Sequence, residues 1–328
     1  MGLTTIWIKP NPEECVYRPS PREGVGLRRV PTEDHNEMAV LYKNLEDAYA
    51  GDSSFRFRWR NESWRIEVSP SVNGSRVYIL RHMMRENDIP TTKEIGVHRV
   101  VRERILSQNI RGLILVAGLQ GAGKTTFSAS LIKDRLTLYG GNVVTIEDPP
   151  EIDLDGMYEG RSGICGQVLQ IDVRKYDHIP LHARSGEAIA SSFRSDTDLL
   201  FFGEIRRSSE ASELVKAVSG VGLCVTTIHA QNPEGALERL ALLMGGSSET
   251  NSILGEAISA VIYLKLDTVA PKSVSMGAVE SPGTIKRLRM MPLFFNGPGP
   301  RSIVKEGRFQ DLRSEIERQH NELSQSMG

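Results

Sequence analysis

The sequence predicts an α/β protein in two parts, a small N-terminal domain built on an antiparallel sheet and a larger domain built on a parallel sheet. Beyond residue 110, short strands that are apolar throughout alternate with amphipathic helices, a pattern typical of a parallel sheet covered on both faces. Before residue 100, apolar and polar residues alternate with a period of two, which indicates antiparallel strands. The length of 328 residues suits about two domains.

The N-terminal domain is expected to span residues 1–90. Its clearest strands are FRFRWR at 55–60, WRIEV at 64–68 and SRVYILR at 75–81. The Asn-Gly pair in SVNG, between the second and third strands, predicts a hairpin turn. Residues 1–50 are rich in proline and match no clear pattern, so their role stays open.

A linker follows this domain. The segment 82–100 contains ENDIPTTKEIG, in which proline and glycine interrupt regular structure, and it leads into the helix-like VHRVVRERILSQ. We place the linker, the expected hinge, at 91–104 and the larger domain at 105–328.

The larger domain shows its alternation of strands and helices directly in the sequence. The predicted strands are GLILVAG, NVVTIED, DLLFFGE and LCVTTIH. The predicted helices between and after them are TTFSASLIKDRLTLYG, SSEASELVKAVSG and PEGALERLALLMG. At the end of the chain, DLRSEIERQHNELSQ predicts a polar, exposed helix.

Composition narrows the functional class. The chain has 40 Lys plus Arg against 41 Asp plus Glu, so no bulk basic field favours nucleic acid or anionic membrane as the main partner. Its three cysteines, Cys15, Cys165 and Cys224, are far apart, which fits a reducing cytoplasm and excludes a four-cysteine zinc site. The N-terminus lacks the layout of a signal peptide, and the longest apolar runs fall short of the ~18 residues of a membrane span. We therefore expect any membrane association to be peripheral or through partners.

The stretch GLQGAGKTT, residues 118–126, carries the spacing G-x-x-x-x-G-K-T between a predicted strand and a predicted helix, the context that a phosphate-binding loop requires. Backbone N–H groups of such a loop converge on phosphates, Lys124 reaches the β and γ phosphates, and the Thr125 hydroxyl holds Mg²⁺. A glycine-rich turn with an incidental lysine is the alternative. The predicted ATP-binding residues are Gly118, Gly121, Ala122, Gly123, Lys124, Thr125 and Thr126.

Hydrolysis of a bound nucleotide needs an acid near the γ phosphate, and two groups of acids lie at the C-terminal ends of predicted strands. Glu204 is at the end of one strand, and Glu147, Asp148 and Glu151 are at the end of another. Because the ends of parallel strands lie on the same edge as the phosphate loop, either group can orient or deprotonate the attacking water. The alternative is that these acids cap the helices that follow.

A histidine, His229, ends a third predicted strand, in TTIHAQNPEG. A lone histidine at a strand end is often structural, but its place on the strand after that of Glu204 favours a role in sensing the γ phosphate. No second His or Cys stands beside it at ligand spacing, so a transition-metal site is not expected.

Taken in order, GLQGAGKTT, TIEDPPE, FRSDTDLLFFGEIR and GLCVTTIHAQNPEGALERL resemble the Walker A, Asp, Walker B and His boxes of the secretion and type IV pilus ATPases. The resemblance extends upstream through RIEVSPSVNGSRVYILRHM and downstream to RSIVKEGRFQDL, and covers roughly residues 50–315. It is strongest to the retraction-like branch that also serves type IVB secretion and conjugation. It implies a RecA-like domain preceded by a PAS-like N-terminal domain.

The resemblance also implies roles for individual residues. Lys124 and Thr125 would hold ATP and Mg²⁺. Glu151 and Glu204 would act on the attacking water, with His229 as the His-box residue.

Four arginines also match the family. Arg65 and Arg81 match arginines of the N-terminal domain that reach nucleotide, although on alternating strands an arginine usually only solvates the exposed face. Arg194 and Arg206 match arginines that are more plausibly structural or at subunit contacts.

The chain departs from the family pattern in three places. Asp196, Thr197 and Asp198 stand where Asp-Pro-Asp is usual, and Arg207 stands where an acid is usual. The stretch after the Asp box, with DLDGMYEGRSGICGQ, is longer than in retraction ATPases. The four-cysteine zinc module of many assembly and export members is missing, which favours retraction-like or conjugative branches.

The sequence as a whole indicates a cytoplasmic ATPase motor of a type IV pilus or type IV secretion and conjugation machine. The resemblance implies a homo-hexamer that works at the inner membrane through partners, with no direct nucleic acid. Two alternatives stay open: a nucleic-acid motor on the same core, and a nucleotide-gated scaffold that does not hydrolyse ATP.

Overall fold

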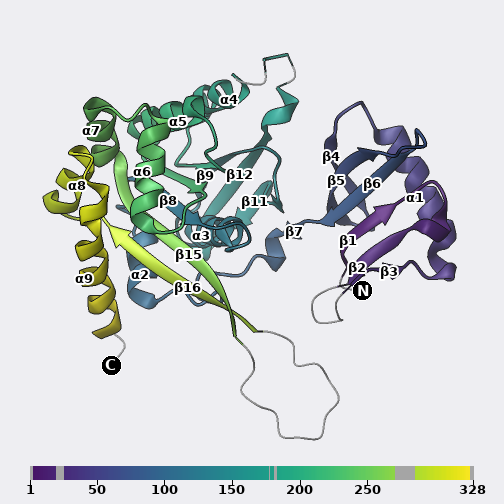
Figure 1. The fold of residues 1–328 in the computed structure, drawn as a ribbon, viewed down its shortest axis with the longest axis horizontal. Coiled ribbons are helices and arrows are strands. Elements are labelled where there is room, and N and C mark those ends of the chain that lie inside the picture. The colour runs from purple at the N-terminus through teal and green to yellow at the C-terminus, as the bar shows by residue number, and fades with distance from the viewer. Residues whose placement is uncertain (1–2, 20–25, 177, 181–182, 270–284, 326–328) are drawn as a thin grey trace, which may run out of the picture. The chain divides into compact units, whose positions relative to one another are not determined.

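The computed structural model describes residues 3–19, 26–176, 178–180, 183–269 and 285–325 (Figure 1). Its contacts divide the chain into two compact units, one within residues 1–85 and one that spans 86–269 and continues from residue 286. The main sheet is antiparallel in the N-terminal unit and mostly parallel in the larger unit, so the predicted fold class is confirmed. Among the described residues, no helix combines the length and apolar character that a membrane crossing requires.

The N-terminal unit is a six-stranded sheet in the order β3-β2-β1-β6-β5-β4. Its strands are β1 (Leu3–Ile8), β2 (Val16–Pro19), β3 (Arg28–Arg29), β4 (Ser54–Trp59), β5 (Glu62–Pro70) and β6 (Arg76–His82), with the short β7 (Met84–Arg85) after them. The Asn-Gly turn joins β5 to β6 as predicted. A second tight turn, at Arg60 and Asn61, joins β4 to β5 with both residues at positive φ.

One helix, α1 (His35–Ala48), packs on this sheet. Its buried leucines, Leu41 and Leu45, belong to one hydrophobic cluster with alternate residues of the strands. In the strand register Ile6 faces Leu80, which faces Ile66. The period-two alternation of the sequence therefore marks the face that the helix covers.

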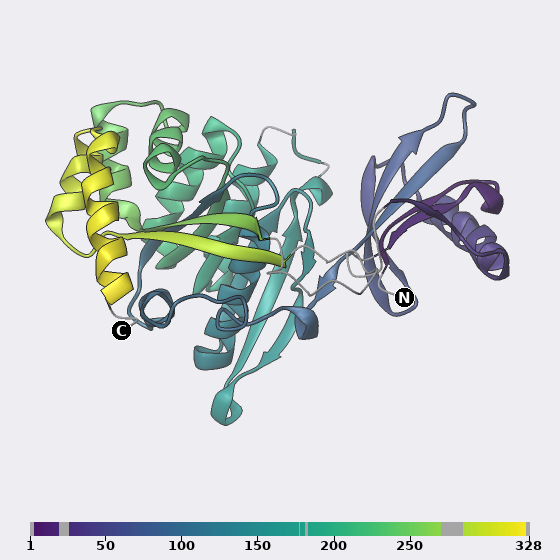
Figure 2. The same ribbon diagram turned by 60° about the horizontal axis from the view of Figure 1, so that its bottom comes forward.

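The larger unit is an eight-stranded sheet in the order β11-β12-β9-β13-β14-β8-β15-β16. Figure 2 shows β15 and β16 lying along one another at one side of it. Its strands are β8 (Gly112–Gly118), β9 (Gly141–Glu147), β11 (Gly156–Glu159), β12 (Cys165–Asp172), β13 (Leu199–Phe202), β14 (Leu223–Ile228), β15 (Ile258–Val269) and β16 (Ile285–Phe294), with the two-residue β10 (Ile152–Asp153) before β11. β8, β9, β13 and β14 are the four predicted strands, and their buried runs explain why they are apolar throughout.

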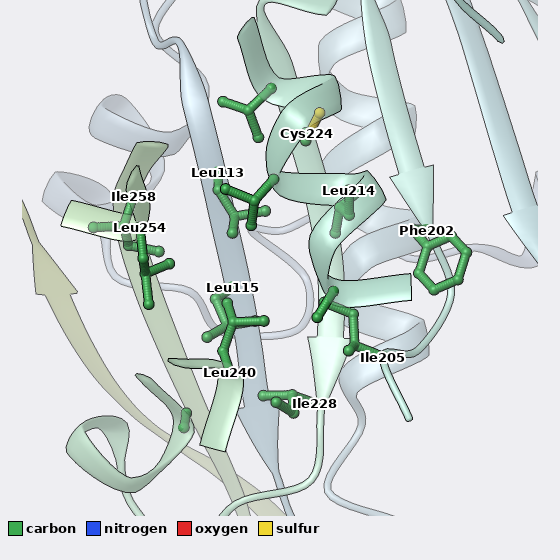
Figure 3. Packing of buried hydrophobic residues seen from close by; sticks show 14 of the residues in the cluster. Leu113, Leu115, Phe202, Ile205, Leu214, Cys224, Ile228, Leu240, Leu254 and Ile258 are labelled. Atoms are coloured by element: carbon green, nitrogen blue, oxygen red, sulfur yellow. The ribbon is translucent and has the colours of Figure 1, made fainter. Parts of the chain in front are cut away.

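Helices cover both faces of this sheet. They are α2 (Arg99–Ile105), α3 (Lys124–Tyr139), α4 (Arg184–Ser192), α5 (Ser208–Val221), α6 (Pro233–Leu243), α7 (Ser248–Ala257), α8 (Pro298–Lys305) and α9 (Leu312–Gln325). Leu113 and Leu115 of β8 lie in one cluster with Leu214 of α5, Leu240 of α6 and Leu254 of α7 (Figure 3). Helix α3, whose buried residues lie outside that cluster, packs against β8, β12 and β14, so it covers the other face.

The residues expected to form a linker contact α3. The Thr92 backbone N–H donates to Asp134 Oδ2 over 2.9 Å, and the Thr92 hydroxyl donates to the same oxygen. Lys133 Nζ donates to the carbonyl oxygen of Ile89 over 2.8 Å. Residues 86–98 accordingly belong to the larger unit, and the division between the two units falls between residues 85 and 86.

Candidate functional site

The phosphate-type loop joins β8 to α3 at one edge of the parallel sheet, as its sequence context predicts. Gly118 is required for space, because a Cβ there would meet the Leu264 carbonyl oxygen of β15 at 2.4 Å. Gly123 is required for conformation, because it caps α3 in the left-handed region at φ 89°. Two glycines thus fix the loop that opens onto the N-terminus of α3.

Lys124, at the start of α3, is buried at 8% exposure. Its Nζ donates to the carbonyl oxygens of Gly118 and Leu119, over 3.0 and 3.1 Å. The same Nζ lies 3.1 Å from Nδ1 of His229. Burial lowers the pKa of Lys124, and the nearby carboxylates of Glu204 and Glu151 oppose that shift.

His229 connects this lysine to Glu204. Its Nε2 lies 2.9 Å from Glu204 Oε1, on the opposite side of the ring from the contact with Lys124. A neutral imidazole that carries its proton on Nε2 satisfies both contacts, since it accepts from the ammonium and donates to the carboxylate. The three residues therefore form a continuous polar chain from the loop to the end of β13.

Glu204 follows β13 and has both carboxylate oxygens engaged. His229 occupies Oε1, and Arg206 approaches Oε2 with Nε at 2.8 Å and a terminal nitrogen at 2.6 Å. The alternative that Glu204 caps the next helix is wrong, because Glu210 has that role. Glu210 Oε2 accepts the backbone N–H groups of Arg206 and Arg207 at the start of α5.

Glu151 lies beside the loop from another direction. Its Oε2 accepts a 2.7 Å hydrogen bond from the Thr125 hydroxyl. The chain after Glu151 continues as the strand β10, so Glu151 does not cap a helix. Thr125 Oγ1 and the carboxylate are oxygen donors of the kind that Mg²⁺ accepts, and no metal site made of three or more His, Cys, Asp or Glu side chains occurs among the described residues. The residues present therefore fit a Mg²⁺ ion, which Thr125 would hold.

Glu147, the first acid of the Asp box, points into the protein and is 4% exposed. Its Oε1 accepts hydrogen bonds from Thr145 Oγ1 over 3.0 Å and from Gln170 Nε2 over 2.8 Å. Burial raises the pKa of Glu147 to about 7, and these hydrogen bonds oppose the shift. Of the acids after β9, Glu151 contacts the loop while Glu147 supports the chain behind it.

Arg65 and Arg81 lie in the N-terminal unit, directly opposite one another on β5 and β6. Arg81 makes an ion pair with Glu67 of β5 at 3.8 Å.

In the larger unit, Asp198 Oδ2 accepts the backbone N–H of Asn142 over 2.8 Å and so holds the start of β9. Each of these contacts lies within one unit.

Two residues of the site were not found from the sequence as parts of it. Arg206 was expected to be structural or at a subunit contact, but it binds Glu204 directly. Gln170 was not singled out at all, because a glutamine in a strand has no distinctive pattern. In the structure it lies on the face of β12 that carries the buried Gly166 and Val168, a position that depends on a strand the sequence analysis did not predict.

Comparison with known proteins identifies relatives. The family model described as "Type II/IV secretion system protein" matches residues 49–285. The chain is 23% identical over 234 residues to the type IV pilus ATPase PilU of Pseudomonas aeruginosa, which covers 71% of this chain and 55% of PilU. It is 29% identical over 192 residues to the putative type II secretion system protein E of Escherichia coli, covering 58% of this chain and 36% of that protein. The chain thus spans about half or less of the length of these relatives.

Solved structures share the fold. A crystal structure of the pilus retraction motor PilT with bound ADP has a TM-score of 0.71 and 22% sequence identity, covering 96% of this chain and 85% of that one. The ATPase DotB of Legionella pneumophila has a TM-score of 0.66 and 18% identity, covering 95% and 83%.

Proposed function

Because the chain belongs to the type II/IV secretion system protein family, as its four boxes indicated, we propose that it is an ATPase that powers a type IV pilus or type IV secretion machine. The observation that supports this most is the convergence of two acids on one phosphate loop. Glu151 contacts Thr125 directly, and Glu204 contacts Lys124 through His229. The ends of four strands, β8, β9, β13 and β14, contribute to this one site.

In the proposed reaction, water attacks the γ phosphorus of ATP, the bond to the β–γ bridging oxygen breaks, and ADP and phosphate leave. Lys124 turns from the carbonyl oxygens of the loop toward the phosphates. Thr125 would hold Mg²⁺, which would offset phosphate charge when bound. A carboxylate, Glu204 or Glu151, orients the water and takes its proton. When the γ phosphate draws Lys124 away, His229 loses its contact with Lys124 and keeps its contact with Glu204. Through His229, the surroundings of Glu204 then depend on whether the γ phosphate is present.

The family resemblance supports further parts of the proposal. Arg65 and Arg81 would bring positive charge to the nucleotide, and such a contribution makes hydrolysis depend on domain arrangement and assembly. The assembly would be a homo-hexamer at the cytoplasmic face of the inner membrane, bound there through partner proteins. Rotation of the N-terminal unit against the larger unit would convert hydrolysis into force.

Replacement of the Walker B acid tests the proposal. In Glu204→Gln, steady-state phosphate release should fall by about 100-fold or more, as expected for loss of a general base, while a fluorescent ATP analogue still binds. Glu213→Gln is the matched control, since Glu213 is an exposed acid on α5 paired with Lys216. Normal phosphate release in Glu204→Gln would rule out the proposed role of Glu204, and no release from the wild type would rule out the ATPase.

A further inference from the structure

The side chain of Gln170, on β12, joins the end of β9 to the chain that follows Glu151. Its Nε2 donates to Glu147 Oε1 over 2.8 Å and to the carbonyl oxygen of Ile152 over 2.9 Å. Its Oε1 accepts the backbone N–H of Leu154 over 3.4 Å. Both amide hydrogens and the amide oxygen are thus used on residues 147–154, the segment that contains Glu151.

Glu147 holds the Gln170 amide in turn. Its Oε1 accepts the bonds from Thr145 and Gln170. The residue after Glu151, Ile152, is therefore fixed by an amide that Glu147 orients. The Glu147–Gln170 pair supports the chain that follows Glu151.

Burying a carboxylate without a cation is costly, and it persists only where hydrogen bonds compensate for lost water. Glu147 is buried, and its hydrogen-bond partners are the Thr145 hydroxyl and the Gln170 amide. Glu151, by contrast, is exposed and meets the phosphate loop through a single hydrogen bond to Thr125. Its position therefore depends mainly on how its backbone is held.

We propose that Glu147 and Gln170 are positioning residues, whose shared hydrogen bonds hold Glu151 at the distance from Thr125 that hydrolysis requires. This inference rests on the proposed function, in which Glu151 acts at the site of hydrolysis. A displacement of about 1 Å in a catalytic group can cost about 100-fold in rate, so a small relaxation of residues 148–154 suffices to impair turnover.

Gln170→Met tests the pair, because methionine has similar length but no donor or acceptor. The matched control is Gln167→Met, on the same strand but on its exposed face, where the amide bonds Asn142 Oδ1 at 3.1 Å near the start of β9. Gln170→Met should lower kcat by about 10- to 100-fold while nucleotide affinity changes less than about threefold. Gln167→Met should leave kcat unchanged.

A second variant distinguishes loss of the hydrogen bond from a simple packing defect. In Gln170→Glu, two carboxylates would face each other, and kcat should fall further. Combining it with Glu147→Gln makes the amide and the carboxylate trade places and restores the hydrogen bond between the two positions. The double variant should therefore be more active than Gln170→Glu alone. Equal or lower activity in the double variant would show that bulk packing, and not the hydrogen bond, matters.

Hydrogen exchange provides a readout that does not depend on hydrolysis. In Gln170→Met, the backbone amides of residues 151–155 should exchange faster than in wild type, and in Gln167→Met they should not. Unchanged exchange, or equal loss of kcat in both variants, would overturn the inference. Faster exchange in a chain whose wild type releases no phosphate would refute the ATPase proposal while confirming that the pair holds this segment.

Discussion

The buried carboxylate of Glu147 should make the larger unit less stable as pH rises from 4.5 to about 7, and Glu147→Gln should remove that effect. Burial raises the pKa of Glu147 from its ordinary value of 4.5 to about 7. Between these values the folded protein holds a proton that the unfolded chain has released. Stability is therefore highest below pH 4.5 for this group, falls as pH rises to about 7, and is flat above it.

The size of the effect follows from the shift. At about 1.4 kcal/mol per pH unit, the rise from 4.5 to about 7 corresponds to about 3 kcal/mol of unfolding free energy. Other groups titrate in the same range, so the informative quantity is the difference between wild type and Glu147→Gln. The unfolding free energy of the variant relative to that of the wild type should rise by about 3 kcal/mol between pH 4.5 and 8. The altered hydrogen bonds of the variant add a contribution that does not change with pH.

The assay is urea unfolding at several pH values, followed by circular dichroism. All three tryptophans, Trp7, Trp59 and Trp64, lie in the N-terminal unit, so their fluorescence would report the wrong unit. Helical dichroism reports mainly the larger unit, which contains α2 to α9.

Glu256→Gln is a control in which the pH dependence of stability should change in the opposite direction. The pKa of Glu256 is lowered by the hydrogen bond from Lys305, so its contribution is present above pH 4.5 and is lost as pH falls. The unfolding free energies of the wild type and Glu147→Gln can be plotted against pH. If the two plots stay parallel to within about 0.5 kcal/mol from pH 4.5 to 8, the reasoning is refuted.

Three further substitutions follow from the packing. Gly203→Ala should lower kcat with little change in melting temperature, because the new Cβ would lie 3.1 Å from Cγ of Glu147; phosphate release and a melting curve measure both. Tyr78→Phe should cost the N-terminal unit about 1–2 kcal/mol, since it removes the 2.9 Å hydrogen bond to Glu46, and tryptophan fluorescence during urea unfolding detects it. Leu115→Ala, in the fully buried centre of β8, should cost the larger unit about 2–5 kcal/mol by circular dichroism.

The central strands could be predicted because they are buried on both faces. β8, β13 and β14 are apolar runs for this reason. Neither the edge hairpin of β11 and β12 nor β15 and β16 was predicted. In β12 exposed and inward positions alternate, with Gln167 outward and Gln170 inward, and such mixed sequences resemble loops because one face meets water.

The sequence predicts a residue of the site only where that residue belongs to one of the four boxes. The Thr125–Glu151 contact joins residues 26 positions apart, and Lys124–His229 joins residues 105 positions apart. Parallel strands carry both pairs to one edge, which the order of the strands predicts. The bond from Gln170 to Glu147 depends instead on strand register, since Asp172 of β12 pairs with Glu147 of β9, and register has no mark in a single sequence.

Stability and activity make opposite demands at Glu147. A neutral, apolar side chain there would spare the larger unit the cost of a buried acid, and the hydrogen bonds of the Glu147 side chain go to Thr145 and Gln170, outside the phosphate loop. Its carboxylate nevertheless accepts a hydrogen bond from Gln170, whose amide also bonds the carbonyl oxygen of Ile152, next to Glu151. A group that lowers stability and orients the amide that holds the chain beside a proposed catalytic residue is the arrangement expected when function, and not folding, determines a residue. If Glu147→Gln proves more stable above pH 7 and less active, both consequences of this arrangement will have been observed in one protein.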